Sequence, residues 1–68
     1  MENRDLTIWT EMHSTIGGRE AHGWYRTDED RMVIVETARG SKTTHIGGSD
    51  PSVLAYIMLR ELADEGKV

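Results

Sequence analysis

The fold is decided by residues 49–66, whose sequence is SDPSVLAYIMLRELADEG. The first three residues are typical of a helix start, a polar N-cap followed by proline at the first helical position. Residues 52–65 contain neither glycine nor proline, and Gly66 is typical of a helix end. At 3.6 residues per turn, one face of this helix collects the apolar residues Leu54, Ala55, Met58, Leu59 and Leu62. The stretch therefore predicts an amphipathic C-terminal helix that needs another layer to pack against.

Upstream of the helix, alternating apolar and polar residues between turn signals predict β-strands. We expect these strands at residues 6–12, 19–27, 32–37 and 41–46. The turns between them are expected at Gly17-Gly18, Asp28-Glu29-Asp30 and Arg39-Gly40, with two, three and two residues. The predicted fold class is α+β, a three- to four-stranded antiparallel β-meander followed by one C-terminal α-helix packed on one sheet face.

The turn lengths also predict which side chains share a face, because residues directly opposite each other on paired strands do so. They place Thr10 opposite Tyr25, Tyr25 opposite Val33, and Val33 opposite Ile46. The helix-facing set, expected to form the core, is Leu6, Ile8, Met12, Tyr25, Val33, Val35 and Ile46. The outer set is Trp9, Glu11, His13, His22, Trp24, Arg26, Met32, Ile34, Thr43 and His45.

Length and composition set the broad class of protein. Sixty-eight residues make a single domain, residues 1–68, with a net charge of −4 and no cysteine. The absence of cysteine excludes disulfides and thiolate metal sites and favours a reducing, cytoplasmic location. The eight Lys and Arg residues form no basic stripe, and no apolar run approaches the roughly 18 residues of a membrane span. We therefore expect a cytoplasmic protein without a membrane partner.

Two apolar surfaces are candidates for binding another protein. The outer sheet face carries Trp9, Trp24, Met32 and Ile34 beside Arg26, and exposed apolar surface of this kind marks interaction sites. Trp9 and Arg26 are also placed for a cation–π contact. The alternative is that the chain itself covers this face. On the helix, the apolar residues away from the core stripe are Val53, Tyr56 and Ile57. A helix that is apolar nearly all round is buried or paired, and a homodimer supplies that pairing.

Metal binding and catalysis find less support in the sequence. The predicted registers put His13, His22 and Glu36 in one row, and two imidazoles with a carboxylate form a zinc or iron ligand set. No motif spacing accompanies them, so exposed strand histidines are the favoured interpretation, and no cofactor is expected. The sequence contains no nucleotide-binding loop and no catalytic-triad pattern, and the chain is short for a cleft of usual size. We therefore expect a protein that is not an enzyme.

Residues 23–66, about two-thirds of the chain, resemble a group of short bacterial proteins to which no activity is attached. The resemblance is carried by Gly23-Trp24-Tyr25, by Lys42-Thr43-Thr44 leading to Gly47-Gly48, and by Leu59-Arg60-Glu61-Leu62. It implies a bacterial protein and no particular reaction.

The layout is also similar, more distantly, to DNA-binding domains built from a three-stranded sheet and a helix. These are the plant ethylene-response domain and the arm-binding domain of tyrosine recombinases. That similarity implies a sheet face in the major groove, with Trp24, Arg26 and Thr43 as contacts. Against it, the predicted register turns Lys42 to the other face, the outer face carries Glu11 and Glu36, and the net charge is negative.

Taken together, these patterns favour a small, non-enzymatic interaction module. Its expected partner is a second copy of itself or another protein, bound through the Trp-bearing sheet face or the outer side of the helix. A sheet-face DNA-binding protein is the alternative, and a histidine-based metal-binding protein is third.

Overall fold

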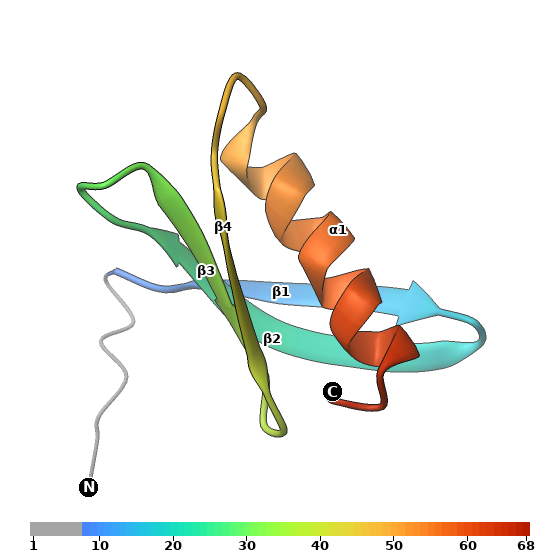
Figure 1. Ribbon diagram of the computed structural model, residues 1–68. Helices are drawn as coiled ribbons and strands as arrows, with labels where there is room; N and C mark the ends of the chain where they lie inside the picture. The colour runs from blue at the N-terminus through green and yellow to red at the C-terminus, as the bar shows by residue number, and fades with distance from the viewer. Residues whose placement is uncertain (1–7) are drawn as a thin grey trace, which may run out of the picture.

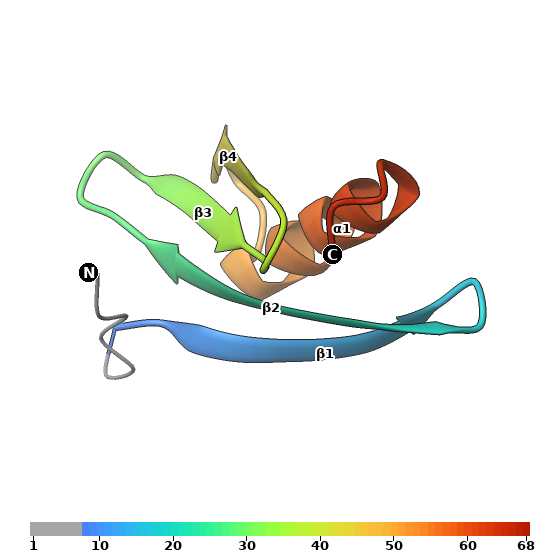
Figure 2. The same cartoon turned by 90° about the horizontal axis from the view of Figure 1, so that it is seen from below.

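A computed structural model describes residues 8–68 of the chain and has the predicted α+β architecture (Figure 1). Its elements are β1 (Thr10–Ile16), β2 (Arg19–Thr27), β3 (Met32–Glu36), β4 (Ser41–His45) and α1 (Pro51–Asp64). The strands form one antiparallel sheet in the order β1-β2-β3-β4, so each strand pairs with the next in the chain. The single helix packs across one face of this twisted sheet, and the other face has no second layer in the described part of the chain (Figure 2).

The first hairpin has the predicted register, with Thr10 opposite Tyr25. Gly17 and Gly18 have φ angles of 59° and 79°, which a two-residue hairpin turn requires and which glycine adopts without steric cost. The tight turn also corrects the bounds of β1. Because pairing continues up to the turn, the strand covers residues 10–16 rather than 6–12. Leu6, predicted to begin this strand, lies outside the described residues, and Ile8, predicted to be core, precedes the strand and is 54% exposed.

The turn between β2 and β3 lies one residue later than predicted. Tyr25 pairs with Val35 instead of Val33, because Asp28 and Met32 close the turn through the Asp28 N–H and the Met32 carbonyl at 3.1 Å. The Asp28 carboxylate also accepts hydrogen bonds from the N–H groups of Asp30 and Met32. Arg31 ends the turn with a φ of 59°, a conformation that usually calls for glycine. Because no glycine stands at this position, no local sequence signal indicates this type of turn.

The turn between β3 and β4 lies one residue earlier than predicted. Thr37 and Gly40 close it, with Thr37 N–H donating to the Gly40 carbonyl at 2.8 Å, so Val33 pairs with Thr44 instead of Ile46. The Thr37 hydroxyl oxygen accepts from the N–H groups of Arg39 and Gly40, which fixes the turn from its first residue. The same hydroxyl donates to the Lys67 carbonyl and so attaches the segment after α1 to the sheet.

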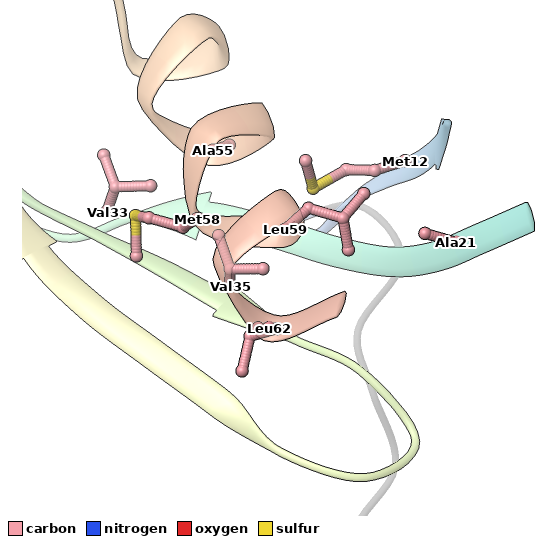
Figure 3. Close-up of a cluster of buried hydrophobic side chains, with 8 residues drawn as sticks. All are labelled: Met12, Ala21, Val33, Val35, Ala55, Met58, Leu59 and Leu62. Carbon is pink, nitrogen blue, oxygen red and sulfur yellow. The ribbon is translucent and has the colours of Figure 1, made fainter. Parts of the chain in front are cut away.

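The core lies between the sheet and the inner face of α1 (Figure 3). Its buried apolar residues are Met12, Ala21, Val33, Val35, Ala55, Met58, Leu59 and Leu62. Tyr25, Ile46 and Leu54, all predicted on this side, are partly buried against it. Both turn corrections move a partner by two residues along a strand, and side chains alternate every residue. The predicted division of the sheet into two faces is therefore confirmed in the described residues although two registers were wrong.

Helix α1 begins as predicted. Asp50 is the N-cap, its carboxylate accepting from the Ser52 N–H at 2.9 Å and from the Ser52 hydroxyl at 2.8 Å, and Pro51 opens the helix. These hydrogen bonds, first of all the one from the Ser52 side chain, lower the pKa of Asp50 below its ordinary value. Gly66 follows the helix with a φ of 74°. No helix within residues 8–68 is long and apolar enough to cross a membrane.

Candidate functional site

The outer side of α1 carries three large apolar side chains that are exposed to solvent. Val53, Tyr56 and Ile57 are 55%, 42% and 49% exposed. They occupy the first two turns of the helix, opposite the buried stripe of Ala55 and Leu62, as the periodicity predicted. These three residues form one apolar patch that the intramolecular core does not use.

Next to this patch lies the free edge of the sheet. β1 is the first strand in the sheet order and pairs only with β2 among the described residues. A groove of about 620 Å³ runs between this strand and the helix. It is lined by Ser14, Thr15, Ile16, Gly17, Ser52, Val53, Tyr56, Ile57 and Arg60. A strand edge and an apolar helix side thus form the two walls of one groove, a combination that no local sequence pattern indicates.

The outer sheet face brings together the predicted aromatic residues but buries each of them partly. The Arg26 guanidinium carbon lies 5.5 Å from the centre of the Trp9 ring, so the predicted cation–π contact is confirmed. Trp24 packs against His22, with ring centres 4.5 Å apart. Met32 and Ile34, farther along β3, are also partly buried. This face is therefore less exposed than the helix patch, although the expected residues do share it.

A cluster of possible metal ligands lies on the same face. His13 and His22 are direct cross-strand partners, as the first hairpin predicted. Their expected third member, Glu36, is not there, because the corrected β2–β3 register places it opposite Trp24. Glu11 takes its place, with one carboxylate oxygen 2.7 Å from His22 Nε2 and 3.5 Å from His13 Nε2. Glu11, His13 and His22 each offer a ligand atom within 4.8 Å of the others.

The charges of the outer face do not favour a polyanion. Trp24, Arg26 and Thr43 do share this face, but strand alternation puts Glu11, Glu20 and Glu36 there as well. Lys42 is turned to the helix side, as the register predicted, because it pairs with the helix-facing Val35. With Arg26 as the one arginine or lysine on this face of the described strands, phosphate attraction is weak.

Lys42 has a structural partner instead. Its Nζ lies 2.8 Å from Glu65 and 3.5 Å from Glu61, so it connects the edge strand β4 to the end of α1. The hydrogen bond to Glu65 is the main reason that the pKa of Lys42 is raised and the pKa of Glu65 is lowered. These groups are at the surface, where such pairs stabilise modestly.

Comparison of the chain with protein-family models, curated proteins and solved structures gave no match. Inference about function therefore depends on the groove, the sheet edge and the two faces of the sheet.

Proposed function

We propose that this domain is an interaction module whose partner is a second copy of the same chain, joined through β1 and the outer side of α1. The observation that carries the proposal is the groove in which a seven-residue edge strand and the Val53–Tyr56–Ile57 patch lie side by side. An open strand edge is a template for pairing, and apolar surface beside it adds the driving force for association.

The hairpin geometry specifies which backbone groups are available for such pairing. The two residues flanking a two-residue turn, Ile16 and Arg19, form a hydrogen-bonded pair, and such pairs alternate along the ladder. The backbone N–H and C=O groups of Glu11, His13 and Thr15 therefore point away from β2. They present a regular set of donors and acceptors along the free edge of β1, which an added antiparallel strand satisfies.

A second copy fits this surface by symmetry. A two-fold axis perpendicular to the sheet pairs β1 with the partner's β1 in the antiparallel sense and extends the sheet to eight strands. The same axis keeps both helices on one face, so that their outer sides approach each other across the seam. Homodimers of this kind use the same patch on both copies, and the apolar residues of each helix then cover those of the other.

The test is the solution mass by light scattering behind gel filtration over a dilution series, with two variants of one exposed residue. Thr15→Pro removes an N–H that points away from β2, so it blocks an added strand and leaves the β1–β2 ladder bonds in place. Thr15→Val keeps the N–H and a β-branched side chain, and is the matched control. We expect a dimer for the natural sequence and for Thr15→Val, and a monomer for Thr15→Pro with an unchanged far-ultraviolet circular dichroism spectrum.

Amide hydrogen exchange provides a second measurement. In a dimer joined at β1, the N–H groups of Glu11, His13 and Thr15 exchange slowly, whereas Thr15→Pro restores fast exchange at the first two. A natural protein that is monomeric at its highest soluble concentration contradicts the proposal. A dimer that Thr15→Pro leaves intact contradicts it too and moves the interface to the Trp-bearing face. A salt-sensitive shift of duplex DNA by the monomer indicates the alternative function of a sheet-face DNA binder.

A further inference from the structure

We propose that Glu11, His13 and His22 form a binding site for a divalent transition-metal ion of the zinc class on the outer sheet face. The proposal uses side chains on the face opposite the helix and is independent of the proposed dimer. It rests on the strand positions, the distances and the donor chemistry of these three residues.

Strand geometry brings the three side chains together without a loop. Glu11 and His13 are two residues apart on β1, so their side chains project from the same face. His22 lies directly opposite His13 on β2, and the Gly17-Gly18 turn fixes that register. All three ligands therefore belong to one tight hairpin of the sheet. A site on such a rigid element needs little rearrangement when an ion binds.

The distances are close to those of a tetrahedral centre. Zinc binds imidazole nitrogen and carboxylate oxygen at about 2.0–2.2 Å, which separates neighbouring ligand atoms of a tetrahedron by about 3.3 Å. The Glu11 oxygen lies 3.5 Å from His13 Nε2 and 2.7 Å from His22 Nε2. One distance is slightly long and the other slightly short, so opening the short contact by less than an ångström admits an ion.

The two histidine rings are stacked on each other. Their centres are 4.4 Å apart and their planes differ by 11°, and both Nε2 atoms approach the same Glu11 oxygen. Trp24 packs against the His22 ring, and the centres of the two rings are 4.5 Å apart. This indole limits how far His22 can turn away, and it places a fluorescent side chain beside the centre.

The donor set selects the class of ion. Two neutral imidazoles with one carboxylate suit zinc, copper, nickel and iron, whereas calcium and magnesium require oxygen ligands. Glu11 and His22 form a hydrogen bond between a carboxylate oxygen and Nε2, and a metal ion bound between these two atoms takes the place of that hydrogen bond. Three protein ligands leave a fourth position for water or for a ligand from another molecule.

The experiment titrates the full-length protein with zinc by calorimetry and with cobalt by visible spectroscopy. The ligand variants are His13→Ala, His22→Ala and Glu11→Gln. The controls are His45→Ala and Glu20→Gln, which remove the same kinds of group elsewhere on the same face. We expect one zinc ion per chain and the strong visible bands of four-coordinate cobalt. Each ligand variant should lower the zinc affinity by at least about tenfold, and neither control should.

Trp24 gives a readout that depends on position. In a Trp9→Phe background, where Trp24 is the one remaining tryptophan, copper should quench its fluorescence, and His22→Ala should abolish the quenching at the same copper concentration.

Equal loss of zinc affinity in His45→Ala and in His22→Ala overturns the proposal, because it indicates adventitious binding by surface histidines. A six-coordinate cobalt spectrum or quenching that survives His22→Ala overturns it as well. The monomeric Thr15→Pro variant should keep the site, so failure of the dimer and failure of the metal centre are distinguishable.

Discussion

Gly23 is a point of close approach between β2, the neighbouring strand and the helix. It lies in the middle of β2, and a Cβ built there would meet the Glu36 carbonyl oxygen at 2.7 Å, Thr37 Cγ2 at 3.2 Å and Leu59 Cδ1 at 3.3 Å. The first of these atoms belongs to the backbone of the neighbouring strand and cannot move alone. A glycine in a strand usually weakens it, but here the missing side chain leaves room for the helix.

Gly23→Ala should therefore lower the free energy of unfolding by about 1–3 kcal/mol, the usual cost of overpacking a core. Gly48→Ala is the matched control, because a Cβ at that position meets nothing within 4 Å and should change stability by less than about 0.5 kcal/mol. Urea unfolding followed by tryptophan fluorescence measures both. Equal stabilities for the two variants would mean that the sheet and helix separate easily at this point.

At the level of elements, local signals in the sequence predicted the helix and the first hairpin. The start and end of α1 are specified locally, by Asp50-Pro51 and by Gly66. The Gly17-Gly18 pair specifies a two-residue turn, because that turn requires positive φ angles. The next two turns depend on Arg31 in a left-handed conformation and on the Thr37 hydroxyl. Neither residue type announces such a turn, so both registers were placed two residues from their true partners.

The helix start should also make stability depend on pH. Because the pKa of Asp50 is lowered in the folded protein, its carboxylate stabilises the fold fully above its ordinary value of 3.8, and this contribution is lost as the pH falls through the lowered value. Glu65, lowered by Lys42, acts in the same direction. Asp50→Asn can still cap the helix but does not titrate, so its unfolding curves should change less between neutral and acidic pH.

Urea midpoints measured from pH 7 down to about pH 2 test this expectation, since the affected window lies below the ordinary carboxylate range. Glu65→Gln is a useful comparison, because it should remove the part of the dependence that comes from the pair with Lys42. Parallel curves for Asp50→Asn and the natural sequence would show that the cap contributes nothing to acid sensitivity.

At the scale of the whole molecule, the division of the sheet into two faces was predictable because it depends only on alternation. Moving a turn by one residue shifts a strand partner by two, which leaves every side chain on its original face. The metal cluster depends on exact register and was therefore predicted only in part. His13 and His22 belong to the hairpin with the glycine turn, whereas the position of Glu36 depends on the turn that ends at Arg31. The carboxylate near the two histidines comes instead from Glu11, two residues before His13 on β1. The groove depends on how the helix crosses β1, which no local pattern specifies.

One hydroxyl joins distant parts of the molecule. Thr37, 8% exposed, binds the β3–β4 turn through Arg39 and Gly40 and binds the segment after the helix through the Lys67 carbonyl. Valine has nearly the same shape as threonine but no hydroxyl, so Thr37→Val leaves these partners without their hydrogen bonds. It should lower the free energy of unfolding by about 1–3 kcal/mol. Thr37→Ser, which keeps the oxygen, should lose clearly less. Hydrogen exchange at the Gly40 N–H should accelerate in the valine variant only. Unchanged exchange there would mean that backbone hydrogen bonds hold the turn without the Thr37 hydroxyl.

Because each strand pairs with its neighbour in the chain, the sheet can assemble one short loop at a time. Closing a short loop costs little chain entropy, and helix α1 then needs only to dock on a surface that the hairpins have already formed. Topologies of this kind fold fast for a protein containing β-sheet, since rate follows the sequence separation of the contacts. We expect folding to follow a single exponential, with the β1–β2 hairpin forming early and the helix docking last.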